Sequence, residues 1–336
     1  MSLPRIRRLA IAAVLVLIVS AVASPSPARA DSECPPPTVT VATPGQLAAA
    51  LAAAQPGDVI SVEDGTYDGN WTATTPGTAE EPIWLCGSSA AVLTNDGITG
   101  GYGLHLDGAD WWHLYGFTVA DAQKGVIVDA AEQVTVEGLT VHGVGDEGIH
   151  LRTHTVDSLV TGNTIHDTGN RREKFGEGVY IGSSDANWGV LTGGQPDRSD
   201  RNTIVGNTIY DTTAEAIDIK EGTSDGVVSG NVMDGAGQTE EGADSWVDAK
   251  GNSWTIVGNT GTHSLLNGYE THHRNLTKNG LGNWGLNNVF TGNVADVQGP
   301  GRGFYVHDPS TTGNVVHCDN TVTGAALGYA NLTCAP

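Results

Sequence analysis

The sequence has 336 residues, with 38 Asp and Glu against 16 Lys and Arg and a formal net charge of −22 at pH 7. A surface of this charge repels nucleic acids and anionic membranes, so we expect neither as a partner. The 46 glycines, the aromatic content of 6% and the short runs of Val, Ile and Thr favour an all-β fold.

Residues 1–30 have the pattern of a secretory signal peptide. Three arginines precede an apolar run from Leu9 to Ala23, and small residues lead to Ala30. The run is shorter than the roughly 20 residues that span a bilayer. We therefore expect cleavage after about Ala30 and a secreted protein.

Residues 31–98 precede the repetitive part of the chain, and we predict that they form an N-terminal cap and the first turns. The stretch from about Pro44 to Ala54 has a helical pattern, and a strand and a turn follow it. Such a helix would cover the apolar core and unpaired backbone that an open solenoid end exposes.

Residues 99–336 repeat one motif, typified by GNTIHDT and GNTIYDT. Its copies start at residues 116, 138, 162, 206, 230, 258, 292 and, in degraded form, 319. The base period of 22 to 24 residues, lengthened by insertions, predicts a solenoid whose turns bury apolar surface by stacking. About three short strands per period indicate a single-domain parallel β-helix of about 8–10 turns.

Residues of two other kinds are interpreted as structural. One asparagine in each of five motif copies is expected to stack at a bend and bond neighbouring backbone: Asn163, Asn207, Asn231, Asn259 and Asn293. Four cysteines allow three pairings, and export favours disulfides. Because each terminal region holds two, we predict Cys34 with Cys86, and Cys318 with Cys334 in a C-terminal cap.

A second register follows each motif copy, in segments that begin at residues 124, 147, 177, 215, 245, 267 and 302. Their third and fifth residues are mostly apolar and face the core, whereas the fourth and sixth share the outer face. Stacked turns lie about 4.8 Å apart, so ionisable and aromatic residues form columns there. Stacked carboxylates repel each other and need a compensating cation.

Two insertions flank these columns. GNRREKFGEG brings Arg171 and Arg172 beside them, and SSDANWGVLTGGQPDRSDRN follows Gly182 and is expected to form a wall. Columns and insertions together predict a cleft for an extended polymer.

The opening QLAAALAAAQPGDVISVEDGTY and the segment EAIDIK, with Glu215 five residues before Lys220, carry a resemblance to a known group of enzymes. The chain resembles the family 6 polysaccharide lyases, of the chondroitinase B and alginate lyase type, and the family 9 pectate lyases. The resemblance implies a right-handed parallel β-helix that uses Ca²⁺. We expect a monomer that binds an extended, acidic polysaccharide.

The same resemblance assigns roles to individual residues. Lys220 matches the general base, Glu215 matches a Ca²⁺ ligand, and Glu177 lies one turn earlier, where a second ligand is expected. Lys250 stands where family 6 has an arginine, and Thr213 stands where it has a further ligand glutamate.

Elimination at a uronic acid explains these residue types. The base must be neutral near pH 7, so repulsion from Lys250 would lower the pKa of Lys220, which Asp218 and Asp248 would oppose unless a metal engages them. Calcium held by carboxylates would neutralise the substrate carboxyl group.

We predict as catalytic residues Lys220, Lys250 and Tyr180, with His150 or His272 as alternative proton donors. The predicted metal ligands are Glu177, Glu215, Asp218 and Asp248, and the predicted substrate-binding residues are Arg152, His150, His272, Tyr305, His307, Arg171 and Arg172.

Other functions fit the same columns. Asp218, Asp248 and Glu270 are stacked carboxylates that would serve an inverting glycoside hydrolase. A C5-epimerase would abstract the same proton as a lyase. A non-catalytic protein that binds carbohydrate or a transition metal is also considered, although its histidines are expected on distant turns: His150, His154, His272, His273 and His307.

Overall fold

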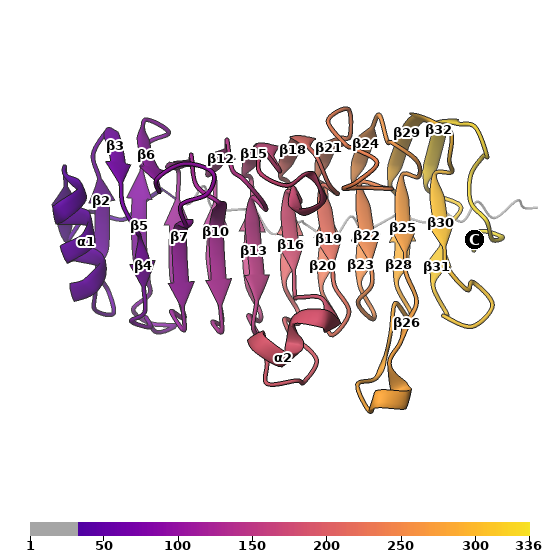
Figure 1. Cartoon of the computed structure of the whole chain (residues 1–336), viewed down its shortest axis with the longest axis horizontal. Helices are drawn as coiled ribbons and strands as arrows, with labels where there is room; N and C mark the ends of the chain where they lie inside the picture. Colours follow the sequence, from indigo (N-terminus) through magenta and orange to yellow (C-terminus); the bar gives the residue numbers. More distant parts are fainter. Residues whose placement is uncertain (1–32) are drawn as a thin grey trace, which may run out of the picture. The chain divides into compact units, whose positions relative to one another are not determined.

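Each turn of the chain contributes a short strand to each of up to three parallel sheets, and successive turns stack in register (Figure 1). This computed structural model describes residues 33–336, of which Cys34–Pro336 form one compact unit. The predicted all-β, single-domain parallel β-helix is confirmed, with about ten turns in the described residues. The predicted signal peptide, residues 1–30, lies outside them.

The strands of the described part of the chain, apart from β26 and β27, fall into three parallel sheets. Sheet 1 contains β1 (Val39–Val41), β2 (Val59–Val62), β5 (Ile83–Gly87), β8 (Trp112–Tyr115), β11 (Thr135–Glu137), β14 (Leu159–Thr161), β17 (Thr203–Val205), β20 (Val227–Ser229), β23 (Thr255–Val257), β28 (Val289–Thr291) and β31 (Val315–Val316). Sheet 2 contains β3 (Gly65–Asp68), β6 (Ala91–Thr94), β9 (Thr118–Ala120), β12 (Thr140–His142), β15 (Thr164–Thr168), β18 (Thr208–Thr212), β21 (Val232–Asp234), β24 (Thr260–Thr262), β29 (Val294–Gly299) and β32 (Thr321–Ala325). Sheet 3 contains β4 (Thr72–Ala73), β7 (Tyr102–Asp107), β10 (Lys124–Asp129), β13 (Ile149–Arg152), β16 (Val179–Ile181), β19 (Ile217–Ile219), β22 (Val247–Ala249), β25 (Tyr269–Thr271) and β30 (Phe304–Val306).

Both ends of the β-helix are covered. The helix α1 (Pro44–Ala53) lies at the first turns, where Leu47 and Leu51 are buried and the Thr43 hydroxyl accepts a hydrogen bond from the backbone N–H of Gln46 (Figure 1). This helix agrees with the predicted cap. At the other end, the last segment forms bridges from Ala330 to Phe304 and from Ala335 to His317.

The four cysteines form the two predicted disulfides, Cys34–Cys86 and Cys318–Cys334. The first ties the segment before α1 to β5, and the second closes the C-terminal segment. In the part of the chain that the structure describes, no helix is long and apolar enough to cross a membrane.

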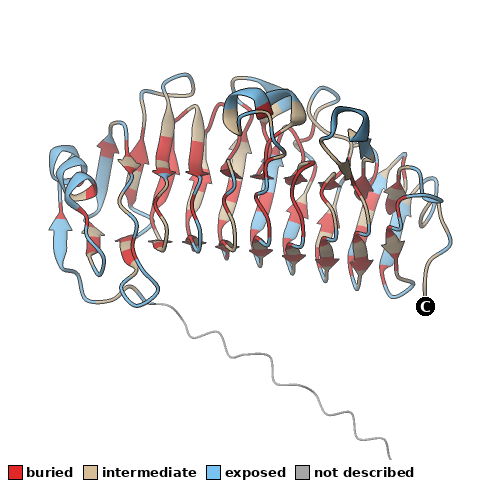
Figure 2. Cartoon of the chain, turned by 90° about the horizontal axis from the view of Figure 1, so that it is seen from below, coloured by how far each residue is buried: buried red, intermediate tan, exposed pale blue. Residues whose placement is uncertain are grey.

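The interior of the β-helix is apolar, and side chains of one turn pack on those of the next. In sheet 3 the inward column is fully buried and consists of Val126, Ile149, Val179, Ile217 and Val247, followed by the larger Tyr269 and Phe304. Figure 2 shows buried residues concentrated along the strands, with exposed residues mainly in the loops and α1. Alternation of inward and outward residues therefore positions the outer columns of sheet 3.

The repeated asparagines form a buried ladder at the bend between sheets 1 and 2. The Nδ2 of Asn207 donates to the Oδ1 of Asn231 at 2.9 Å, and that of Asn231 donates to Asn259 at 2.9 Å. Each Oδ1 also accepts from the backbone N–H of the preceding asparagine. Gly206, before Asn207, has a φ of 66°, a conformation that favours glycine. The structural interpretation of these asparagines is confirmed.

Two longer insertions follow the ends of strands of sheet 3, and both project from the same side of the β-helix (Figure 1). One follows β16 and contains η2 (Asp185–Asn187) and α2 (Trp188–Leu191). The other follows β25 and contains an antiparallel hairpin of β26 (Arg274–Asn275) and β27 (Asn283–Trp284) around η3 (Thr277–Asn279). A third insertion, with η1 (Glu173–Phe175), precedes β16.

Candidate active site

The strands β13 to β30 have the register that the sequence predicts. Along the fourth position, each residue pairs with the next in the series His150, Tyr180, Asp218, Asp248, Glu270 and Tyr305. Two residues further along the chain, directly after each of the last four strands ends, lie Lys220, Lys250, His272 and His307. The outer face of sheet 3 therefore gathers residues that are up to 157 positions apart in the sequence.

Two lysines and two aspartates form a tight ionic cluster on β19 and β22. The Nζ of Lys220 lies 2.6 Å from Oδ2 of Asp218. The Nζ of Lys250 lies 3.0 Å from Oδ1 of Asp218 and also contacts Asp248. The other oxygen of Asp248 lies 2.8 Å from Nδ1 of His272. Asp218 and Asp248 are buried, whereas 15% of each lysine side chain is exposed, so the cluster faces outward through its cations.

The carboxylates keep both lysines charged. Burial lowers the pKa of Lys220, but Asp218 and Glu177 outweigh burial and raise that pKa above its usual value. Burial also lowers the pKa of Lys250, and Asp218 and Asp248 again raise it overall. Repulsion from Lys250 therefore does not give Lys220 the lowered pKa that the sequence-based mechanism requires, because the charges of Asp218, Glu177 and Glu215 raise it overall.

A trio of buried carboxylates lies beside the lysines. Glu177, Glu215 and Asp218 each offer an oxygen within 4.8 Å of the others. Burial and then the charges of Glu147 and Asp218 raise the pKa of Glu177 to about 8, and burial and Asp218 also raise that of Glu215. Among the described residues, Oε2 of Glu177 has no hydrogen-bond partner.

Such a trio suits a hard divalent cation. Calcium prefers several carboxylate oxygens, and a cation would relieve the repulsion that raises these pKa values. The unpartnered Oε2 of Glu177 is a further oxygen open to it. Three of the four predicted metal ligands thus lie together, whereas Asp248 belongs to a neighbouring group with Glu215 and Asp244.

Tyr180 lies next to the lysine cluster. The Nζ of Lys220 is 5.1 Å from the centre of the Tyr180 ring, and the centre of the His150 ring is 4.2 Å from that of Tyr180. Burial and Asp218 raise the pKa of Tyr180 well above its usual value, so the phenol keeps its proton. His150 is buried, its Nε2 lies 2.7 Å from the carbonyl oxygen of Gly182, and burial lowers its pKa.

A pocket of about 250 Å³ opens above the cluster. It is lined by Ser184, Lys220, Glu221, Lys250, His272 and Arg274. Ser184 comes from the insertion that contains α2, which agrees with the predicted wall. Arg274 comes from the β26 hairpin, whose part in the wall the sequence did not reveal. Arg274 donates to Asp185 at 2.7 Å, so the two insertions meet along the pocket.

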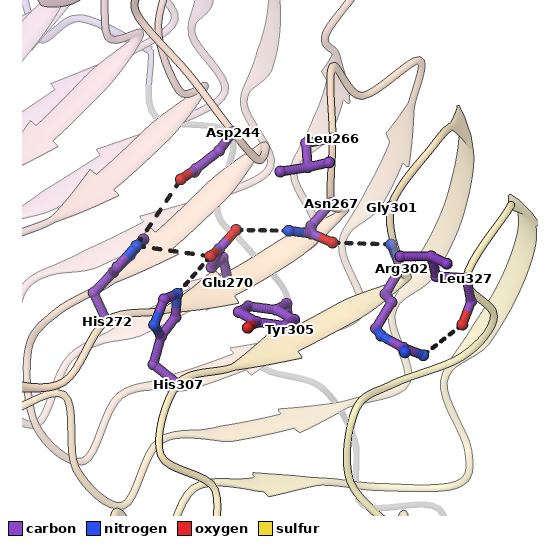
Figure 3. A pocket seen from close by; sticks show the side chains of 10 residues that line it. All are labelled: Asp244, Leu266, Asn267, Glu270, His272, Gly301, Arg302, Tyr305, His307 and Leu327. Carbon is purple, nitrogen blue, oxygen red and sulfur yellow. Dashed lines mark hydrogen bonds and ion pairs between the residues drawn. The ribbon is translucent and has the colours of Figure 1, made fainter. Parts of the chain in front are cut away.

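A second pocket, of about 310 Å³, lies beside the first over β25 and β30, and the two share His272 (Figure 3). Its lining includes the predicted residues His272, Tyr305 and His307, together with Asp244, Leu266, Asn267, Glu270, Gly301, Arg302 and Leu327. Arg302 and Asn267 were not predicted as site residues, although both stand first in their repeat segments and this position could have pointed to them. Burial raises the pKa of Glu270 to about 8.

Three predicted substrate-binding arginines have carboxylate partners elsewhere. Arg152, two turns before Lys220, donates through Nε to Asp129 at 2.7 Å. Arg171 and Arg172 both donate to the buried Asp146. The linings of the two pockets described above do not include these arginines. Contact with a longer polymer stays a prediction for them.

Comparisons with known proteins agree with this architecture. A family model described as "Pel9A-like, right handed beta helix region" matches residues 37–326. The alginate lyase from Paenibacillus sp. str. FPU-7 is 32% identical, with a TM-score of 0.79 over 89% of this chain and 100% of that one. No curated protein matches the sequence.

Two structures of lower sequence identity are also similar to this chain. Pectate lyase Pel9A is 15% identical, with a TM-score of 0.53 over 82% of this chain and 72% of that one. The PL6 family alginate lyase AlyGC is 13% identical, with a TM-score of 0.45 over 84% of this chain and 52% of that one. The repeat register, the capped parallel β-helix and the match over residues 37–326 lead to one conclusion: the chain belongs to the Pel9A-like right-handed β-helix family.

Proposed function

We propose that this protein is a secreted, calcium-assisted polysaccharide lyase that cleaves alginate, a uronic-acid glycan, by β-elimination. The observation that carries the proposal is the position of Lys220, which lines a pocket and contacts Asp218 of the carboxylate trio. The 32% identity to an alginate lyase over nearly the whole chain supports the substrate class.

Elimination removes the C5 proton of a uronic acid and breaks the bond to the leaving oxygen. Calcium held by Glu177, Glu215 and Asp218 would neutralise charge that develops on the substrate carboxylate. Those same carboxylates raise the pKa of Lys220. Their pairing with a cation would remove this effect, and burial would then lower the pKa of Lys220 towards that of a general base.

Tyr180 and Lys250 have different parts in this scheme. Tyr180 keeps its proton and lies against Lys220, which supports a role for Tyr180 as the donor to the leaving oxygen. Lys250 contacts both Asp218 and Asp248 and so fixes the aspartate beside the base. His272, held by Asp248, lies where the two pockets join.

The cations explain how an acidic protein attracts an acidic polymer. Lys220, Lys250 and Arg274 line the first pocket, and Arg302 lines the second. They provide a local positive strip within a chain of net charge −22. The adjacent pockets fit neighbouring sugar units of an extended chain.

Product analysis tests the proposal. The protein is incubated with alginate, pectate, glucuronan and glycosaminoglycans, each with Ca²⁺ and with EDTA, while ultraviolet absorbance of unsaturated uronates is recorded. We expect absorbance to rise with alginate and Ca²⁺ and to be lost in EDTA. An increase in reducing ends without this absorbance would overturn the elimination mechanism, and full activity in EDTA would overturn the role of calcium.

One observation favours an inverting hydrolase as a second candidate. Asp248 and Glu270 pair on adjacent strands, and their pKa values are displaced in opposite directions. Burial raises that of Glu270 to about 8, whereas Lys250 and His272 outweigh burial and lower that of Asp248. A protonated acid and an ionised base form the pair of carboxyl groups that such a hydrolase uses. The same assay separates the two functions by their products.

A further inference from the structure

Two histidines and two carboxylates converge in the second pocket (Figure 3). Glu270, His272 and His307 offer ligand atoms that all lie within 4.8 Å of one another. The elimination mechanism proposed above does not involve a metal ion bound by these residues. The expectation that the histidines lie on distant turns is wrong for this pair, because β25 and β30 are neighbours and the two rings stack at 4.1 Å.

His272 is held in the orientation of a metal ligand. Its Nδ1 lies 2.8 Å from Oδ1 of Asp248. Because a carboxylate oxygen accepts the hydrogen bond, Nδ1 carries the proton when the ring is neutral. The lone pair of Nε2 is then available and faces the pocket, 3.7 Å from Oε1 of Glu270 and 3.9 Å from Oδ2 of Asp244. Metal-binding histidines commonly donate their other ring N–H to a carboxylate in this way.

The remaining donors surround the same point. Nε2 of His307 lies 2.8 Å from Oε1 of Glu270, and Oε2 of Glu270 accepts from Asn267 at 2.9 Å. Among the described residues, Oδ1 of Asp244 is buried without a hydrogen-bond partner. Tetrahedral zinc with bonds of about 2.0–2.2 Å places its ligand atoms about 3.4 Å apart. The observed separations of 2.8, 3.7 and 3.9 Å need only small side-chain movements to meet this.

We propose that Glu270, His272 and His307, with Asp244, form a binding site for a divalent transition-metal ion such as Zn²⁺. Imidazole nitrogen with carboxylate oxygen suits first-row transition metals, whereas the all-oxygen trio of Glu177, Glu215 and Asp218 suits calcium. The two sites therefore select different ions. Because the second pocket is the proposed site of a neighbouring sugar, a bound zinc ion displaces substrate there and inhibits the enzyme.

Calorimetry on protein without a histidine tag, stripped with EDTA and titrated with Zn²⁺ alone, tests the site. We expect one zinc ion per chain in the wild type, and affinity at least about 100-fold weaker in His307→Ala and in His272→Ala, since loss even of a supporting residue commonly costs 10–100-fold. The matched control is His263→Ala. That histidine also lies against a carboxylate, 3.0 Å from Asp234, but outside both pockets, so its variant retains wild-type affinity.

Binding is measured without polysaccharide, so its outcome is independent of the proposed lyase activity. Thermal unfolding in EDTA establishes that each variant is folded, and His307→Gln replaces any alanine variant that is not. The proposal is overturned if the wild type binds no stoichiometric zinc, or if zinc affinity is unchanged in the folded His272 and His307 variants. Weakened binding in both, with calcium binding unaffected in His307→Ala, supports it.

Discussion

Two columns of stacked polar side chains run along this solenoid, and they differ in hydrogen bonding. In the asparagine ladder, Asn231 donates to Asn259 and accepts from Asn207, so each amide satisfies its neighbours. In sheet 3, Glu177 and Glu215 stand on successive turns, and both have raised pKa values. An amide is both donor and acceptor, whereas a carboxylate only accepts. A stack of amides is therefore self-sufficient, and a stack of carboxylates requires cations.

The largest expected effect comes from removing the charged side chain of Lys220, which lies beside the carboxylates. Lys220→Ala should lower kcat on alginate by about 10²–10⁴-fold, the usual contribution of a general base. Initial rates of unsaturated product formation measure it. The matched control is Lys278→Ala, at an exposed lysine of η3. Equal turnover in the wild type and Lys220→Ala would remove Lys220 from the base role.

Breaking the asparagine ladder should cost stability instead of chemistry. In Asn231→Ala, the side-chain and backbone N–H groups of Asn207 lose their acceptor, and the carbonyl of Ile204 loses a donor. At 1–3 kcal/mol for each buried unsatisfied group, we expect a loss of about 3 kcal/mol in the free energy of unfolding. Urea denaturation measures this, and turnover per folded molecule should stay at the wild-type value. A variant as stable as the wild type would show that the ladder adds nothing.

Neutralising Glu215, one of the stacked glutamates, should have the opposite effect on stability in the absence of calcium. Glu215→Gln removes a like charge, so without calcium we expect it to be at least as stable as the wild type. Calcium at 100 times its Kd should stabilise the wild type by about 2.7 kcal/mol and leave this variant unchanged. Thermal unfolding with and without calcium measures the difference, with Glu241→Gln, at an exposed position, as control. An equal response to calcium in Glu215→Gln would exclude Glu215 as a ligand.

The smallest effect is expected at Asp146, a carboxylate that is already paired with two arginines. Burial raises the pKa of Asp146, but hydrogen bonds from Arg172 and Arg171 outweigh burial and lower it below its usual 3.8. The stabilisation is thus fully present above that usual pKa and is lost as pH falls through the folded-state value. We expect Asp146→Asn to be about 1 kcal/mol less stable than the wild type at pH 6, since one pKa unit corresponds to about 1.4 kcal/mol. Urea denaturation from pH 6 to pH 3 should show the two proteins converging, and a constant difference would contradict this.

Much of the architecture can be predicted from the sequence because each turn of a solenoid repeats the same spacing of residues. Copies of one motif specify the register that aligns Tyr180 with Asp218 and Asp248, and they place the asparagines in one ladder. The clustering of cysteines at the two ends was enough to indicate their pairing. The register and the ladder thus follow from periodicity, and the disulfides follow from the positions of the cysteines.

Two kinds of feature of the site could not be predicted in this way. They are the contacts of side chains outside the repeat and the pKa values on which several groups act in opposite directions. Arg274 lines the first pocket because a hairpin outside the repeat folds back and donates to Asp185. The pKa of Lys220 depends on the sum of burial and the charges of Asp218, Glu177 and Glu215, and the spacing in the sequence gives no sign of the result. Arg171 and Arg172 are near the columns in sequence, yet Asp146 holds both.

The covered ends of the β-helix have a consequence for assembly. An uncovered end of a parallel, in-register solenoid offers a full row of free backbone donors and acceptors, like the growing end of an amyloid fibril. The helix α1 at one end and the segment closed by Cys318–Cys334 at the other place non-repeating chain against those rows. A second molecule then finds no matching strand to extend, so a fold built on strand addition stays finite.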